Sequence, residues 1–417
     1  MTRAVRFLPL ARQRGAGLVE TMVGILIGLF VVLAVYSLLS TSEGYRRATS
    51  GASDAQISGL LSQFVLARDA GNGGNGILLA GDDDVNYMAS CIKDEAGNAD
   101  LTMRPVPILI TDSGNAEISD SFIAMNSGSP RVNWPVNFVD TDSLAGADFL
   151  VQSPNGFTVP PPATTPYWVI AAVNDGTGRC GRFQVVDAQP APVSAQGQIV
   201  LKTNPVSTLT YVANQAKLMN LGPVGLATRV RYDSYNATAN ELCGATDKKR
   251  ECQLYSTDML TAGAARNPVA PGVVLVKIQY GVDTSATPDD MIDCWTPADN
   301  ANVCGDGKDY RTASVQNFTL DNLNRILAVR IAVVVRSDEP DLKDPTLIAD
   351  PTNTNPLRRP DVILFNCSAN NATCQSRIVL PMGTVASGKI IQDGYRYRTY
   401  ETIVPLRNTI YVGTLPP

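Results

Sequence analysis

The sequence RGAGLVETMVGILIGLFVVLAVYSLLSTS, residues 14–42, organises the rest of this chain. From Thr21 to Ser42 it carries no charged residue. As a helix those roughly 22 residues would extend about 33 Å, which is enough to cross a bilayer core. Residues 1–15 include four arginines and no acid: Arg3, Arg6, Arg12 and Arg14. This positive flank predicts a cytoplasmic N-terminus, so the rest of the chain would lie outside the cytoplasm.

Glu20 is the only acidic residue in this stretch. A cleaved signal peptide would have an apolar core of about 7–15 residues and then a small-residue cleavage site. Here the apolar run is longer, and no A-x-A site follows it. A plain membrane anchor explains everything except the carboxylate, which is costly at the membrane edge and usually functional. An interfacial glutamate without any role is the remaining alternative.

The segment resembles the N-terminus of type IV prepilins and pseudopilins. In that family a basic leader ends in glycine, and the fifth mature residue is glutamate. These positions correspond here to Gly15, Ala16 as first mature residue, and Glu20. The resemblance implies cleavage between Gly15 and Ala16 by a prepilin peptidase, N-methylation of Ala16, and pairing of Glu20 with the N-terminal amine of a neighbouring subunit. Two departures, Ala16 where phenylalanine is usual and Ser37 where major pilins tend to have proline, argue against a major pilin.

Composition limits the functions that are open to the chain. The leader holds four of the 34 basic residues and none of the 39 acidic ones, so its removal would shift the formal net charge from −5 to −9. An acidic protein of this kind is a poor candidate for nonspecific nucleic-acid binding. The chain contains no histidine, which excludes histidine-based catalysis and histidine metal ligands within it.

Eight cysteines in an exported chain predict disulfides. Six of them form three close pairs across polar, turn-forming residues, which favours local bonds and leaves Cys91 to pair with Cys180. Zinc is the competing interpretation, but the spacings are wider than those of common zinc sites. The predicted bonds are Cys91–Cys180, Cys243–Cys252, Cys294–Cys304 and Cys367–Cys374.

Downstream of the apolar run, helical spacing of apolar residues continues to about Arg68 and ends at GNGGNG, residues 71–76. We therefore predict one helix over residues 16–70, transmembrane at about 21–42 and then amphipathic, with one face packed on a domain. A helix that ends near Ser42 is the alternative. Large apolar residues recur along the extension and include Ile57, Leu60, Leu61 and Phe64.

Residues 71–417 read mostly as short strands separated by long polar loops. Examples are YWVIAAVN at 167–174, STLTYVAN at 207–214, GVVLVKIQYGVD at 272–283 and RILAVRIAVVVRS at 325–337. Proline clusters mark loops or a subdomain limit near residue 195. The predicted fold class is α+β: a long N-terminal helix packed on an antiparallel, sheet-rich globular domain, as in pilins.

The carboxyl-terminal part resembles prepilin relatives of the PilW type. The similarity rests on Tyr280-Gly281-Val282-Asp283, on the strand Val329–Arg336, and on Leu406-Arg407-Asn408. It implies a non-catalytic minor pilin that helps to initiate pilus assembly within a tip complex. The implied partners are prepilin peptidase, other minor pilins, the major pilin and a large tip adhesin. The implied location is the inner membrane of a Gram-negative bacterium before assembly, and then the pilus at the cell surface.

Acidic residues after Val282 offer oxygen ligands for calcium, although a solvated acidic loop without a metal is the favoured interpretation. The candidates are Asp283, Asp289, Asp290 and Asp293. No P-loop, G-x-S-x-G or H-E-x-x-H motif is present, so we predict no cofactor and no enzymatic activity. A type II secretion pseudopilin is the alternative function, and a membrane-anchored periplasmic enzyme is the second alternative.

Overall fold

The computed structural model describes most of the helix and the strands, and the statements below refer to these residues. They are residues 17–75, 91, 93–98, 106–128, 135–139, 148–152, 166–173, 177–190, 198–213, 216–224, 229–244, 251–261, 263–298, 304–308, 310, 323–338, 362–365, 377–380 and 395–407. They form one long helix and several antiparallel sheets, so the predicted α+β class is confirmed. Cleavage residues Gly15 and Ala16 lie outside the described residues, as does Asn408.

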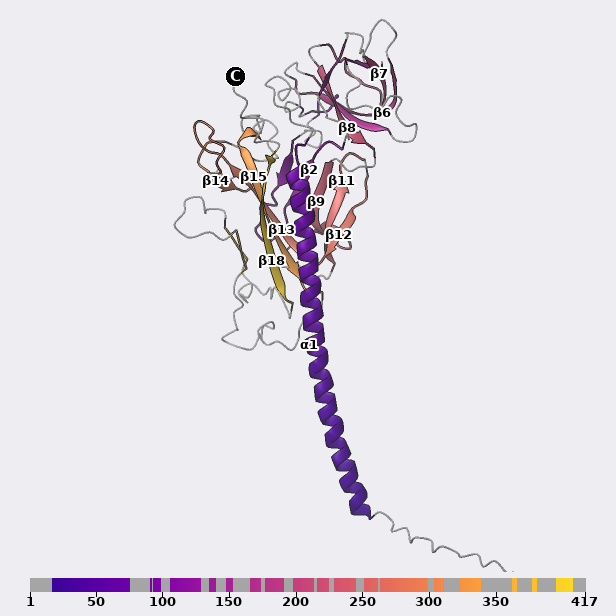
Figure 1. Ribbon diagram of the computed structural model, residues 1–417, viewed down its shortest axis with the longest axis vertical. Coiled ribbons are helices and arrows are strands. Elements are labelled where there is room, and N and C mark those ends of the chain that lie inside the picture. The colour runs from indigo at the N-terminus through magenta and orange to yellow at the C-terminus, as the bar shows by residue number, and fades with distance from the viewer. Residues whose placement is uncertain are drawn as a thin grey trace, which may run out of the picture. The chain divides into compact units, whose positions relative to one another are not determined.

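The helix α1 runs without interruption from Leu18 to Asn72 (Figure 1). The alternative in which the helix ends near Ser42 is therefore wrong. The boundary between two compact units, Met1–Gly51 and Ala52–Pro417, falls inside α1. The helix ends where Gly73 and Gly74 follow, and Gly74 has a φ of 80°, a conformation that suits glycine.

Two sheets enclose one core together with the second half of α1. Sheet 1 has the order β1-β2-β9-β11-β12, with β10 paired to β9, and sheet 2 has the order β14-β13-β15-β18. Leu66 of α1, Phe122 and Tyr232 of sheet 1, and Ile331 of sheet 2 belong to this core. The strands of these sheets are β1 (Ile108–Thr111), β2 (Ser121–Met125), β9 (Arg229–Asn236), β10 (Glu241–Leu242), β11 (Cys252–Asp258), β12 (Asn267–Pro271), β13 (Val273–Val282), β14 (Cys294–Thr296), β15 (Ile326–Arg336) and β18 (Tyr397–Pro405).

Strands β13 and β15 pair side by side at the centre of sheet 2, and every residue of both strands is buried. This burial on both faces explains why apolar residues dominate both strands without alternation. The polar exceptions, Lys277, Gln279, Arg330 and Arg336, are also buried. A short hairpin of β16 (Val362–Leu364) and β17 (Ile378–Leu380) contributes Leu364 and Leu380 to a core with Leu275 and Val334.

A third sheet has the order β3-β8-β5-β6-β7-β4 and closes on itself. Its two end strands meet, because Phe138 and Val151 form an antiparallel bridge and the amide of Val139 donates to the carbonyl of Leu150 at 3.1 Å. The six strands therefore form a barrel. Its interior holds the stacked rings of Phe138 and Tyr211, and the ring of Phe149 meets both of them edge to face. The barrel strands are β3 (Val136–Asn137), β4 (Phe149–Val151), β5 (Tyr167–Val173), β6 (Cys180–Pro190), β7 (Ile199–Asn204) and β8 (Ala216–Pro223).

The subdomain limit expected near residue 195 lies between β6 and β7, outside the described residues. These two strands are neighbours in the barrel and pair from Gln184–Asn204 to Pro190–Ile199. A division at that point would separate two paired strands of one sheet.

The strand expected at 207–214 is wrong, because the described residues 207–213 form no strand. Instead, the Glu95 carboxylate accepts hydrogen bonds from the hydroxyl of Ser207 (2.7 Å), the amide of Thr208 (2.9 Å) and the hydroxyl of Tyr211 (2.8 Å). The carboxylate thus satisfies one backbone amide, that of Thr208, which a sheet ladder would otherwise have paired, and two side-chain hydroxyls.

Six of the eight cysteines lie among the described residues. Cys91 is bonded to Cys180, Cys243 to Cys252, and Cys294 to Cys304, the same partners that the spacing predicts. The remaining predicted pair, Cys367–Cys374, lies outside the described residues. The Cys91–Cys180 bond ties the segment that carries Glu95 to the first residue of β6.

Candidate functional site

The first part of α1 is long and apolar enough to cross a membrane, by length and composition. Its large apolar side chains are exposed along the whole run, from Leu18 (76%) to Leu39 (59%). Glu20 lies in the first turn of the helix, and its amide donates to the carbonyl of Gly17 at 2.9 Å. An acid at this end of a helix interacts favourably with the helix dipole.

The helix packs on the sheets through small residues. Ala55, Ser58, Ser62, Leu66 and Ala70, spaced three or four apart, are buried, and all but Leu66 are small. Small side chains allow a helix to approach a sheet closely, and the close approach is most marked at Gly59, where a Cβ would lie 2.0 Å from the ring of Tyr400.

The large apolar residues of the extension form a separate, exposed face. Ile57 is 62% exposed, Leu60 51%, Leu61 42% and Phe64 64%. The apolar residues at helical spacing predict a face that packs on the domain, and they include Ala55 and Leu66 together with these four. Ala55 and Leu66 do pack in the core, whereas these four remain exposed because small residues occupy most of the packing face. The second half of α1 is therefore apolar on a side that the domain leaves uncovered.

Polar contacts hold the second half of α1 to both sheets. The side-chain amide of Gln63 donates to the carbonyl of Glu401 on β18 at 3.0 Å. Near the end of the helix, the hydroxyl of Tyr232 on β9 donates to the carboxylate of Asp69. Burial and this carboxylate raise the pKa of Tyr232 above its ordinary value. The exposed apolar face is thus carried on a helix that is fixed in rotation.

The acidic loop between β13 and β14 brings together three of the four candidate calcium ligands. Oxygens of Asp283, Asp289 and Asp293 lie within 4.8 Å of one another, and Asp290 is not part of this group. Asp283 accepts hydrogen bonds from the amides of Ser285 (2.9 Å), Asp289 (2.8 Å) and Asp290 (3.0 Å). The amide of Thr284 is the main cause that lowers the pKa of Asp293.

We expect this loop not to bind calcium. The Arg325 guanidinium donates to the carbonyls of Asp283 (3.3 Å) and Ser285 (2.7 Å), so a fixed cation already lies beside the loop and uses two of its backbone oxygens. Calorimetric titration with calcium chloride should give no heat beyond dilution. A saturable heat that disappears in Asp283→Asn would contradict this prediction.

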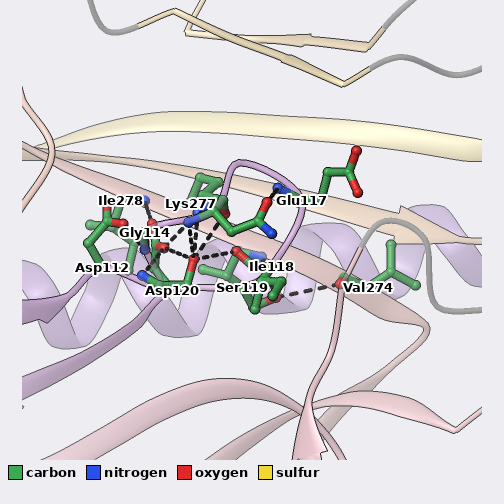
Figure 2. Close-up of polar contacts among 12 residues, drawn as sticks. Asp112, Gly114, Glu117, Ile118, Ser119, Asp120, Val274, Lys277 and Ile278 are labelled. Carbon is green, nitrogen blue, oxygen red and sulfur yellow. Dashed lines mark hydrogen bonds and ion pairs between the residues drawn. The ribbon is translucent and has the colours of Figure 1, made fainter. Parts of the chain in front are cut away.

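A buried ion pair joins the two sheets (Figure 2). The Lys277 ammonium on β13 lies 2.7 Å from the carboxylate of Asp120, which directly precedes β2, and their side chains are 3% and 1% exposed. Lys277 also donates to the hydroxyl of Ser113 (3.1 Å) and the carbonyl of Asn115 (2.8 Å). The other carboxylate oxygen of Asp120 accepts from the amide of Ile278 at 3.2 Å. Its partners come from both sheets, so the pair fixes one sheet against the other.

Asp120 should make stability depend on pH. Burial raises the pKa of its carboxyl to about 6, although Lys277 opposes the shift. The pKa of Asp120 is higher in the folded than in the unfolded state, so protonated Asp120 stabilises the fold. This contribution to the free energy of unfolding is complete below about pH 4 and is lost as the pH rises through about 6. Between pH 4 and pH 7, the wild-type free energy of unfolding should fall relative to Asp120→Asn by on the order of 2 kcal/mol. Denaturant unfolding of both proteins tests this, and parallel pH curves would contradict it.

Residues 244–408 match the family model described as type IV pilus-assembly protein W, or PilW. The matched range includes the acidic loop and all four strands of sheet 2, whereas the barrel lies before it. Comparisons with curated proteins and with solved structures returned no match.

Proposed function

We propose that this chain, a PilW-type pilus-assembly protein by its match over residues 244–408, is a minor pilin of a type IV pilus. It is held in the inner membrane by the first part of α1 until it enters the base of a filament. There it helps to initiate assembly and becomes part of the tip complex. Its partners are prepilin peptidase, other minor pilins, the major pilin and a large tip adhesin.

The main observation in support of this proposal is the exposed apolar face of α1. A bilayer needs only about 20 apolar residues, and the run to Ser42 supplies them. The exposed apolar residues continue beyond it, at Tyr45, Ile57 and Phe64 among others. The side chains of Ile57 and Phe64 are covered neither by lipid nor by the chain's own domain. Packing against the helices of other subunits would bury them, at about 1.5–3 kcal/mol for each large side chain.

A type II secretion pseudopilin would share the apolar helix and Glu20, and the match to a pilus-assembly family favours the pilus. The deciding experiment is a deletion strain. We expect loss of surface pili with protein secretion intact, and recovery of pili when the full chain is supplied. Lost secretion with normal piliation would overturn the proposal in favour of the pseudopilin.

Processing and incorporation should separate at two positions. Replacing Gly15 should leave the leader uncleaved, because the resemblance places the peptidase site between Gly15 and Ala16. Glu20→Ala should be cleaved normally but should reach sheared pili in amounts reduced about tenfold or more, because the amine of a neighbouring subunit would lose its partner in an apolar core. Mass spectrometry of the N-terminus and quantitative blots of pili measure the two effects.

Glu43→Ala is the matched control for Glu20, since Glu43 is an exposed acid of the same helix just beyond the apolar run. Its cleavage and incorporation should equal those of the wild type. Equal loss of incorporation in both variants, or normal incorporation of Glu20→Ala, would count against the role of Glu20.

A further inference from the structure

The face of sheet 1 that carries Arg231, Asp233 and Tyr235 lies opposite the one that supplies Tyr232 to the core. Side chains alternate between the two faces of a strand, so these three project together from β9. Arg266, which directly precedes β12, joins them, as does Tyr255 of β11, the cross-strand partner of Asp233. We call these five residues the arginine cradle.

Asp233 holds two guanidinium groups in place without satisfying either. Its carboxylate is 1% exposed and lies 3.3 Å from Nε of Arg231 and 3.8 Å from Nε of Arg266. Neither carboxylate oxygen has a hydrogen-bond partner, and neither does Nε of Arg231. Buried polar atoms without partners are uncommon and call for an explanation. Two cations on one anion also leave the cradle with an excess positive charge.

The guanidinium groups are ordered and accessible at the same time. Arg266 stacks 3.6 Å above the ring of Tyr235, which itself meets the ring of Tyr255 edge to face at 6.4 Å. The side chains of Arg231 and Arg266 are 33% and 35% exposed. Among the residues that the structure describes, neither arginine donates a hydrogen bond. Each therefore keeps N–H donors for a ligand, in an orientation that is already fixed.

We propose that the arginine cradle is a docking site for an aspartate or glutamate side chain on a neighbouring pilus subunit. A carboxylate offers two oxygens that match the planar donors of arginine. It would also neutralise the excess charge. Exposed arginine beside tyrosine is the composition of interface hot spots between proteins, which favours a protein partner over a small anion. The identity of the partner as a pilus subunit rests on the proposed function.

Binding of a model acidic peptide tests the chemistry without any pilus. Hexaglutamate is titrated into the detergent-solubilised full chain by calorimetry, with hexaglutamine as the uncharged control. We expect hexaglutamate alone to bind, and Arg266→Gln to raise its Kd about tenfold through the loss of charge-assisted hydrogen bonds. Arg266→Lys should be intermediate, because it keeps the charge but not the planar donors. Arg398→Gln, an exposed arginine of β18, should leave the Kd unchanged.

Three results would overturn the proposal. They are no binding of hexaglutamate, equal binding by wild type and Arg266→Gln, or displacement of the peptide by inorganic phosphate at lower concentration than free glutamate requires. Thermal unfolding of each variant verifies that the fold is kept.

A cellular arm then tests the partner. Arg266→Glu should lower the amount of this chain in sheared pili about tenfold, while Arg398→Glu should not. Normal recovery of Arg266→Glu would overturn the docking role. If the wild-type chain is absent from pili but binds hexaglutamate as expected, the proposed function is wrong. The arginine cradle is then still supported as a carboxylate-binding site.

Discussion

Lys277→Met is expected to lower the free energy of unfolding by about 3–5 kcal/mol at pH 7, because it leaves the Asp120 carboxylate buried without its cation. The methylene stem is largely kept, so the loss reports charge more than volume. Asp120 would still accept hydrogen bonds from the amides of Ser113 (3.1 Å) and Ile278 (3.2 Å), but these do not neutralise it. Denaturant unfolding of the full chain in detergent measures the difference.

The pH dependence separates this cause from a simple packing defect. Without Lys277 the folded pKa of Asp120 rises further, so the carboxyl is neutral and the loss is smaller near pH 5. The gap between wild type and Lys277→Met should widen as the pH rises to 7. Lys202→Met is the control, because Lys202 is 48% exposed and lies 3.6 Å from Asp187. Its effect should stay within about 0.5 kcal/mol. A loss in Lys277→Met that does not change with pH would contradict the electrostatic explanation.

Gly59→Ala should destabilise the protein by up to about 2 kcal/mol, although alanine favours helix by about 1 kcal/mol over glycine. The new Cβ would lie 2.0, 2.4 and 2.5 Å from Cε2, Cδ2 and Cζ of Tyr400. The ring would have to move away from α1, and overpacking of this kind costs about 1–3 kcal/mol. The free energy of unfolding of the variant, measured in denaturant, gives the net effect.

The sign of the effect should reverse in a Tyr400→Ala background. There the ring is gone, so only the helix preference of alanine remains, and Gly59→Ala should stabilise by up to about 1 kcal/mol. This double-mutant cycle isolates the contact between the two positions. Destabilisation by Gly59→Ala in both backgrounds would show that the contact with Tyr400 is not the cause.

Elements with a strong local pattern could be predicted from the sequence. The uncharged run to Ser42 predicts a helix, and the β-branched runs of β13 and β15 predict strands. Each of these predictions needs only residues that are adjacent in the sequence. The packing face of α1 could not be predicted in this way. Helical periodicity is read from large apolar residues such as Ile57 and Phe64, whereas close approach to a sheet selects small ones such as Ser58 and Ser62.

The long-range features had no local signal at all. Asp120 and Lys277 are separated by 157 residues, and each alone looks like a surface charge. Closure of the barrel depends on β3, which is two residues long, and on β4, which is three. Strands so short show no periodicity. The arginine cradle combines β9 with Arg266 through strand pairing that the sequence does not display.

The closed barrel has a consequence for aggregation. An open sheet offers unpaired N–H and C=O groups to any extended chain nearby, which makes its edge a template for aggregation. In the barrel, the two edge strands β3 and β4 pair with each other through the bridge between Phe138 and Val151. A module closed in this way can be exposed to other proteins without pairing with their strands. The amide of Val139 donates a hydrogen bond between β3 and β4. Val139→Pro would remove it, separate the two edge strands, and leave the barrel with exposed edges that can pair with other chains.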